Sequence, residues 1–471
     1  DDSLEALYGQ PGEAGKYIHP YIVHTTPGGT KIGMLGLLGL DAYDVSNAKP
    51  LIGSGSMDEL AQTAQVTVDL LRDEEKVDMV IALAHMGIHM EQGTATYETI
   101  ELAEKTEGID LILSGHSHTF MDEIVAVPSQ VANDWTTYTM ECGCYGKMLC
   151  RYDVSFEDGT RTFDAQAIDV ANDLPSLEEL NTYIETLEDD IEENFLPSYP
   201  LLPLAEAFLS GEFFQVLTHS AFDLPRRNNE PSNLGNLVAD AMREASGAQM
   251  AFASNGGDLR ESLPVTRGDE INLQDAFIVT PLGTGPDKML GYPLAKFYTS
   301  LSQIHLILET TVCDLGLANN DYMIQMSGLR VVVDNSLAGT YNCVQKIVLY
   351  EEMDESDAGT LLFDKQDGGF QVDKDNLYEV CTSSYIADKM SGLGVFPLDA
   401  EGNKISFIDA IVKDGENREI KLWYSFALKL AAMDPISDQY NPDELMNTVG
   451  PYWRRVWDLD GGEPQLLRGH E

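Results

Sequence analysis

The chain has 471 residues, with 78 acidic side chains, 29 basic ones and a formal net charge of −49. A field of this sign repels nucleic-acid polymers and anionic membranes, which argues against DNA or RNA as a partner. The sequence contains no apolar run long enough to span a bilayer. The length predicts two domains, because one hydrophobic core rarely serves so many residues.

The first third of the sequence alternates segments with strand and helix character. In chain order we expect a strand at 21–24, a buried strand at 31–40, a helix at 56–73, a strand at 77–85, a helix at 94–106, a strand at 109–115 and β-rich sequence to about 170. Ser56 and Glu59 form a capping box that begins the first helix. The two short runs rich in Val and Ile, one helix length apart, are typical of strand–helix–strand units with buried strands.

Histidines gather at the ends of these two runs. His85 ends the first run, and Gly115 is followed by His116 and His118 at the end of the second. Ligands bind at the carboxyl ends of strands in open α/β sheets, and imidazole is the commonest metal ligand in proteins. A single histidine at a strand end is more often a hydrogen-bonded structural residue. The His-x-His pattern facing another strand-end histidine favours a metal site instead. His89 is equally compatible with a solvated loop, so we leave it out of the predicted site.

The second part of the chain begins after an acidic, strongly helical stretch. We expect domains at 1–172 and 204–471, with residues 173–203 as a linker helix and Pro-rich connector. The elements expected in the second domain are a helix at 232–246, a strand at 249–253, helices at 295–309 and 419–433, and strands at 324–333, 344–350 and 378–383. The Gly-rich loop that runs from Asn255 to Arg260 permits close approach of a ligand, although alone it could be a plain turn.

The six cysteines match no zinc-finger spacing. Cys142 or Cys144 could pair with Cys150 in an oxidising compartment. For most of the six, a role as small buried packing residues is the favoured interpretation.

Six segments of the chain carry a family resemblance: PGGTKIGMLGL, VIALAHMG, GIDLILSGHSHT, PSNLGNLVADAM, SNGGDLR and QDAFIVTPLG. With them the sequence resembles the two-domain metallophosphoesterases of the 5′-nucleotidase and UDP-sugar hydrolase family. The resemblance implies an α/β (α+β) protein with an N-terminal calcineurin-like β-sandwich flanked by helices, a linker helix and a C-terminal α/β domain that binds substrate. It also implies two divalent metal ions, such as Zn or Mn, with His85 and His116 as ligands of the second ion and His118 as a ligand of the first.

The same resemblance assigns the substrate-binding residues. Asn255 and Arg260 match the family motif, and Arg226 or Arg227 stands where the family places further cations. Tyr385 matches one wall of an aromatic clamp for the base. Leu282 replaces the aromatic residue of the other wall, which removes a stacking contact worth about 0.5–1.5 kcal/mol beyond area burial. The segment 391–394 carries no acid where the family has its ribose-binding Asp. The phosphate side of the pocket is therefore expected to be kept and the nucleoside side to be degraded.

The family motifs expected ahead of this sequence, Asp-x-His and Gly-Asn-His-Glu/Asp among them, are absent from it. They would supply most oxygen ligands and the catalytic histidine, so no catalytic residue is assigned here, and an N-terminal fragment of the same protein would be a partner.

Two functions stay open at this point. The first is a secreted or periplasmic metal-dependent phosphoesterase that hydrolyses nucleotides or related small phosphate esters. The second is a non-catalytic extracellular binding or structural protein that keeps the fold. The intact GHSH motif favours the first.

Overall fold

The computed structural model describes residues 8–9, 13, 16–45, 55–91, 93–132, 134–157, 160–170, 175–196, 215–263, 269–319, 323–351, 358–441, 456–460 and 463–466. The chain divides into two compact units, Asp1–Leu177 and Glu178–Glu471. The predicted connector, residues 173–203, spans this division, and its last part lies outside the described residues.

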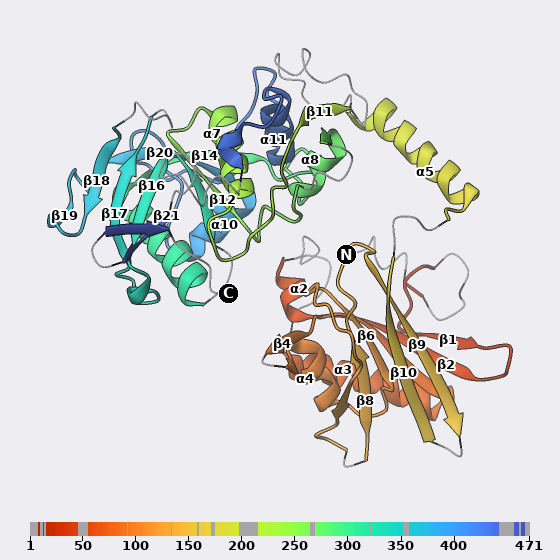
Figure 1. The fold of residues 1–471 in the computed structure, drawn as a ribbon. Helices are drawn as coiled ribbons and strands as arrows, with labels where there is room; N and C mark the ends of the chain where they lie inside the picture. The colour runs from red at the N-terminus through yellow and green to blue at the C-terminus, as the bar shows by residue number, and fades with distance from the viewer. Residues whose placement is uncertain are drawn as a thin grey trace. The chain divides into compact units, whose positions relative to one another are not determined.

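The first unit is built on a six-stranded sheet in the order β1-β2-β3-β6-β8-β7 (Figure 1). Its strands are β1 (Ile22–Thr25), β2 (Lys31–Leu38), β3 (Met79–His85), β6 (Leu111–Gly115), β7 (Val125–Pro128) and β8 (Thr136–Met140). The four central strands run parallel, and β1 and β7 close the two edges antiparallel. The register places Leu38 opposite His85 and His85 opposite Gly115, so β2, β3 and β6 end at one edge of the sheet.

Helices and two hairpins complete this unit. They are α2 (Leu40–Val45), α3 (Met57–Asp73), α4 (Glu98–Lys105), the short pair β4 (His89–Glu91) and β5 (Thr94–Thr96), and the long pair β9 (Met148–Glu157) and β10 (Thr160–Asp169). The capping box of Ser56 and Glu59 is confirmed, and α3 ends at Asp73 as predicted. The helix predicted at 94–106 begins later, because residues 94–96 pair with β4 and Tyr97 takes a positive φ of 91°.

A buried carboxylate ties the sheet of the first unit to the β9–β10 hairpin. Asp110, only 2% exposed, forms ion pairs with Arg72 of α3 and Arg161 of β10 and also accepts the Val80 amide at 2.7 Å. Both guanidinium groups lie over the ring of Trp135, at 5.4 and 5.1 Å from its centroid. Burial lowers the pKa of both arginines, and the charge of Asp78 opposes that shift. Asp110 is the buried carboxylate that pairs directly with both of them.

We expect Asp110→Ala to lower the free energy of unfolding by about 3–5 kcal/mol, because it leaves two half-buried cations and a buried amide without their acceptor. Chemical denaturation followed by tryptophan fluorescence measures the loss. Asp153→Ala is the matched control, since it breaks the ion pair with Arg151, in which both side chains are well exposed, and should cost less than about 1 kcal/mol. Equal effects of the two substitutions would contradict this role of Asp110.

The second unit contains a four-stranded sheet, β14-β20-β12-β15, and a six-stranded sheet, β19-β18-β17-β16-β21-β22. Its elements are α5 (Glu178–Asp190), η1 (Ile191–Phe195), β11 (Val216–His219), α7 (Asn233–Ser246), β12 (Met250–Ser254), β13 (Glu270–Asn272), α8 (Leu273–Val279), β14 (Leu294–Ser300), α9 (Leu301–Leu308), η3 (Glu309–Ala318), β15 (Ile324–Ser327), β16 (Leu329–Val333), η4 (Asn335–Leu337), β17 (Val344–Leu349), β18 (Thr360–Asp364), β19 (Gly369–Phe370), β20 (Leu377–Ser383), α10 (Ser384–Gly392), α11 (Leu422–Ala431), η5 (Asp438–Tyr440), β21 (Val456–Asp460) and β22 (Glu463–Leu466).

The four-stranded sheet is buried on both faces. Ala251 and Ala253 of β12 belong to one core with residues of α7 and α11. Met250 and Phe252, which alternate with them, belong to a second core with residues of α9 and β14. A strand covered on both sides reads as a continuous apolar run rather than an alternation. This burial fixes the strand ends, and the loops that follow them, in the second unit.

Two element predictions in this unit need correction. The helix predicted at 295–309 is wrong in its first part, because residues 294–300 form β14 and pair with β20, and the helix begins only after the N-cap Ser300. The strand predicted at 324–333 is two strands, β15 and β16, separated by Gly328 at a φ of 79°. The helix at 232–246 is confirmed, with Ser232 as its N-cap.

The cysteines are more often paired than predicted. Cys142 is bonded to Cys150 in the first unit and Cys313 to Cys343 in the second. The possible disulfide at Cys150 is confirmed, with Cys142 as its partner, whereas the interpretation of Cys313 and Cys343 as packing residues is wrong. Cys381 is a buried free cysteine as expected.

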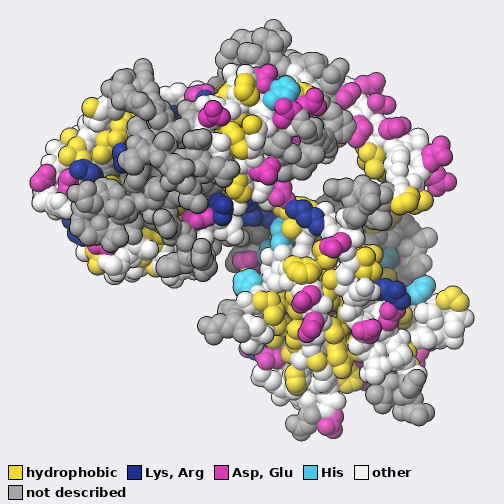
Figure 2. Space-filling view, viewed as in Figure 1, with side chains coloured by type: hydrophobic (Ala, Val, Ile, Leu, Met, Phe, Trp, Pro, Cys, Tyr) yellow, Lys and Arg dark blue, Asp and Glu magenta, His cyan; other side chains and the backbone are white. Residues whose placement is uncertain are grey.

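The acidic helix α5 has no buried residue. Figure 2 shows its acidic side chains at the surface. Within the described part of the chain, no helix combines the length and apolar character needed to cross a bilayer.

Candidate functional site

The histidine pair of the first unit lies at the edge where β3 and β6 end. The rings of His85 and His116 are 4.9 Å apart between centroids, with their planes tilted by 59°. His85 is exposed and His116 half-buried, so neither ring points into the packed core. Burial lowers the pKa of His85, and His116 adds to the shift, while Glu141 opposes it. The neutral form that coordinates metal ions is therefore favoured at His85.

The backbone around the histidines is strained. His116 has a φ of 105° and His118 a φ of 59°, both in a region that side chains other than Gly rarely adopt. Such strain persists only where the surroundings impose it, and it concentrates at functional sites.

A carboxylate from α2 meets the histidine pair. Asp41 Oδ2 lies 2.8 Å from His116 Nε2. The start of α2 is held by Glu98, which accepts the Leu40 amide at 2.9 Å and the Asp41 amide at 3.0 Å. Burial, followed by Asp41 and Glu98, raises the pKa of the neighbouring Tyr97 to about 12. The edge therefore presents two imidazoles and one carboxylate.

A second carboxylate, Glu141, positions the loop that carries the histidines. It follows β8 and is only 1% exposed. Its Oε2 accepts the Ile88 amide at 3.0 Å and the Ser117 hydroxyl at 2.8 Å, and its Oε1 accepts the Thr119 amide at 3.1 Å. The loop after β3 and the loop after β6 are thus fastened to one side chain.

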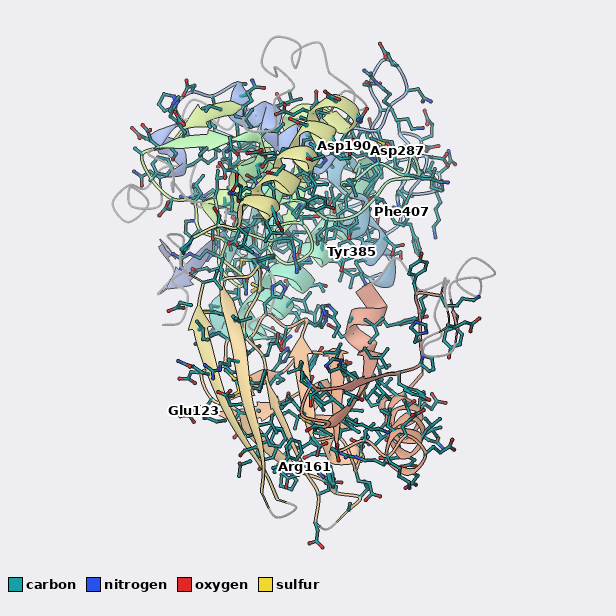
Figure 3. The ribbon with its side chains drawn as sticks, turned by 90° about the vertical axis from the view of Figure 1, so that its right-hand side faces the viewer. Glu123, Arg161, Asp190, Asp287, Tyr385 and Phe407 are labelled. Carbon is teal, nitrogen blue, oxygen red and sulfur yellow. A yellow bond between two sulfur atoms is a disulfide. The ribbon has the colours of Figure 1, made fainter. Side chains whose placement is uncertain are left out.

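We expect Glu141→Ala to release these loops, because one buried donor and two half-buried donors lose their charged acceptor, at a cost of about 2–3 kcal/mol in total. Amide hydrogen exchange should accelerate at Ile88 and Thr119 and stay unchanged in α3. Glu123→Ala is the control, since Glu123 is exposed in the same unit (Figure 3). Unchanged protection at Ile88 and Thr119 would rule out this positioning role.

The other histidines of this region are separate from the pair. His118 packs edge-on against Tyr145, 5.2 Å between centroids, and His89 stacks on Tyr97 at 3.9 Å. In the described part of the chain, His85, His116 and His118 do not bring three ligand atoms within 4.8 Å of one another. One group there meets that criterion, Glu309 with Cys313 and Cys343, but its cysteines are joined in a disulfide.

In the second unit, three loops converge at one edge of the four-stranded sheet. Strands β12 and β20 are parallel neighbours, and β14 runs antiparallel to β20 with Leu294 opposite Ser383. The loop after β12, the start of α10 and the turn before β14 therefore meet. They carry Asn255 to Arg260, Tyr385 and Tyr292.

The predicted substrate-binding residues are distributed around these loops. Arg226 donates its Nε to the Asn255 carbonyl at 2.8 Å, and Arg260 donates its amide to the Val279 carbonyl at 2.8 Å. Arg227 is half-exposed and pairs with Glu230 at 3.0 Å. Asn255 is fully buried, and its Oδ1 has no hydrogen-bond partner among the described residues. Tyr385, labelled in Figure 3, lies against Tyr292. The structure thus brings Arg226, Asn255, Arg260 and Tyr385 to one region and turns Arg227 toward an acid.

Asp258 is a buried acid inside the same loop. Its Oδ2 accepts the Ser254 amide at 2.8 Å, while its Oδ1 has no partner among the described residues. Burial raises the pKa of Asp258 to about 6, against the opposing hydrogen bonds from Ser383 and Ser254.

This raised pKa predicts that the folded protein loses stability as the pH rises toward 7. Near pH 4 the carboxyl is largely protonated in the folded chain; as the pH rises toward 6 the unfolded chain loses the proton first, so unfolding becomes easier. Counted from low pH, the contribution lost by pH 7 is about 3 kcal/mol. Asp258→Asn cannot titrate at this position, so its free energy of unfolding relative to the native chain should rise by about 2 kcal/mol between pH 4 and pH 7. Denaturant titrations at both pH values measure it, and a constant difference would contradict the assignment.

Two family models match this chain, one in each of its two units. A family model described as calcineurin-like phosphoesterase matches residues 19–120, and one described as 5′-nucleotidase, C-terminal domain, matches residues 211–397. Together the two models match more than half of the chain.

The chain belongs to the two-domain 5′-nucleotidase family.

Relatives of several organisms share these domains. The trifunctional nucleotide phosphoesterase protein YfkN of Bacillus subtilis is 31% identical over 288 residues, which cover 58% of this chain and 17% of that protein. The 5′-nucleotidase of Vibrio cholerae is 25% identical, covering 54% of this chain and 48% of that protein. The chain thus spans about half or less of the length of these two relatives.

A solved structure supports the fold. The 5′-nucleotidase precursor of Thermus thermophilus is similar with a TM-score of 0.61 and 21% identity, and the match covers 89% of this chain and 73% of that one. The fold class expected from the sequence, a calcineurin-like first domain and an α/β second domain of the 5′-nucleotidase type, is confirmed.

In this member of the 5′-nucleotidase family, the sequence prediction missed Glu141, Asp41 and Tyr292. Glu141 follows a strand at the same sheet edge as the histidines, so the strand-end rule that selected His85 would also have selected it. Asp41 was hidden because the apolar run at 31–40 masked the start of α2. Tyr292 carries no signal of its own before the strand β14 is recognised.

Proposed function

We propose that this chain is a metal-dependent phosphoesterase that hydrolyses nucleotides or related small phosphate esters with two divalent ions, Zn or Mn among the candidates. The observation that carries the proposal is the facing pair His85 and His116 at adjacent parallel strand ends, with a carboxylate oxygen at His116. The small phosphate ester is the partner that this site requires.

The donor set fits such ions. Imidazole nitrogens and a carboxylate oxygen are ligands that both Zn²⁺ and Mn²⁺ accept. Asp41 in contact with His116 would orient the ring or share the ion with it. His118, on the same loop, is the remaining candidate ligand. When bound, a pair of divalent ions supplies a hydroxide near neutral pH and neutralises charge on the phosphoryl oxygens.

The chain's own residues would hold and orient the reactants. His85 and His116 would bind an ion through neutral imidazoles, and Glu141 would keep their loops in place. Within the second unit, Arg260 and Arg226 are each anchored to a backbone carbonyl, and their charge would attract an anionic ester there. Asn255 offers an unpartnered carbonyl oxygen at the same loop, among the residues that the structure describes.

We further propose that the protein works in a periplasmic or extracellular setting. Its two disulfides support this, since such bonds persist in oxidising compartments and are rare where thiols are kept reduced. The charge of −49 fits solution in a salty medium.

Metal analysis tests the proposal. We expect dialysed protein loaded with Zn²⁺ or Mn²⁺ to retain metal, and His116→Ala to lower its affinity by at least about tenfold. When a segment with the family's Asp-x-His and Gly-Asn-His-Glu/Asp motifs is supplied together with the chain, turnover of p-nitrophenyl phosphate should appear, and it should be lost in His116→Ala and on treatment with a chelator. His89→Ala, a histidine of the same unit outside the pair, is the control.

Near-zero metal in the native chain, together with no turnover of p-nitrophenyl phosphate when those motifs are supplied, would refute the enzyme. That result would favour the rival function, a non-catalytic binding or structural protein that retains the fold.

A further inference from the structure

Two tyrosines stack on one another at the substrate-binding edge of the second unit. The rings of Tyr292 and Tyr385 lie 5.2 Å apart between centroids, with their planes inclined by only 25°. Tyr292 comes from the turn before β14, and Tyr385 from the first turn of α10. Both side chains are half-buried. Tyr385 is the residue that the family resemblance assigns to base stacking, so its face is already covered by a side chain of the same protein.

At two glycines the main chain lies close to the rings of this pair. A Cβ added at Gly283, whose φ is 86°, would lie 2.1 Å from the ring of Tyr292. A Cβ added at Gly257 would lie 2.7 Å from the ring of Tyr385. Tyr292 is also fixed through its backbone, since its amide donates to the Leu282 carbonyl at 2.9 Å and its carbonyl accepts the Leu422 amide at 2.9 Å. Each ring therefore has backbone close beside it.

A nucleobase cannot fit between these rings as they stand. A planar base sandwiched between two aromatic rings needs about 7 Å between them, twice the contact distance of about 3.5 Å. The observed separation of 5.2 Å is that of two rings in direct contact. Because main chain lies close to each ring at Gly283 and Gly257, we expect the slot to open only when one of the rings moves away.

The polar surroundings favour a neutral Tyr292 in this position. Burial raises the pKa of Tyr292 to about 12, and Tyr385 and Asp258 add to the shift, while Arg260 opposes it. Lys389 lies over the ring of Tyr385 at 5.4 Å. The pair is thus a persistent apolar stack beside the arginines that would receive a phosphate.

We propose that Tyr292 occupies the place where a base would stack on Tyr385, and that the protein therefore prefers small phosphate esters without an aromatic base, such as sugar phosphates, over nucleotides. This inference rests on the proposed phosphoesterase function. Leu282 in place of an aromatic residue and the lack of an acid at 391–394 agree with it.

Adenosine binding to the full chain tests the slot without requiring metal or turnover. By calorimetry we expect weak binding to the native chain and about tenfold tighter binding to Tyr292→Ala, the factor that corresponds to about 1.4 kcal/mol. Tyr292→Ala combined with Tyr385→Ala should lose the gain. Tyr341→Ala, which removes an exposed tyrosine, is the matched control and should change nothing. Should Tyr292→Ala fail to fold by circular dichroism, Tyr292→Ser vacates the slot in the same way.

The relative turnover of two phosphate esters provides a second test of this proposal. In metal-loaded protein, kcat/KM for ribose 5-phosphate should equal or exceed that for AMP, and Tyr292→Ala should shift the ratio toward AMP by about tenfold. Weaker adenosine binding to a folded Tyr292 variant, or no gain in it, overturns the proposal. Loss of the phosphoesterase function itself is distinguishable, because it abolishes turnover of both esters and leaves the adenosine result intact.

Discussion

The carboxylate of Glu141 is the interaction on which the first unit's candidate site depends. Four parallel strands bring their ends to one edge, but strand ends alone leave the following loops free to take many conformations. Glu141 removes that freedom by accepting Ile88, Ser117 and Thr119 at once, from the loops after β3 and β6. The positive φ angles of His116 and His118 are tolerated only in such a frame. A buried charge with several donors is costly to disrupt, so it specifies the loop geometry as well as stabilising it.

The sequence predicted the parts of this site that follow from strand ends. Buried strands of Val and Ile, and histidines directly after them, were enough to locate His85 and His116 at one edge. Asp41 was out of reach, because the apolar run before it has no boundary signal and the helix α2 is short. The role of Glu98 as a cap for α2 depends on a contact between residues 58 positions apart in the chain. Local patterns do not encode such contacts.

The errors in the second unit have physical causes as well. The segment 294–308 is rich in apolar residues, because both β14 and α9 bury side chains in the core, and the two short elements follow one another without a break, so neither period stands out. Ser300, with Gln303 in a capping box, marked the true start of the helix. The Cys313–Cys343 disulfide joins η3 to the residue before β17 across 30 residues. Counting cysteines could not find it, because the pairing depends on how those two elements pack.

The close approach of Gly283 to Tyr292 and of Gly257 to Tyr385 has an evolutionary consequence. Since main chain lies close to each ring, the position of the slot depends on the fold, whereas the side chain at position 292 determines whether the slot is filled. A lineage could exchange one class of ester for another by replacing the residue at position 292 and leaving every strand and helix in place. Relatives with high overall sequence identity could then differ in whether they prefer esters with or without an aromatic base. The residue at position 292 would predict that preference better than the identity of the whole domain.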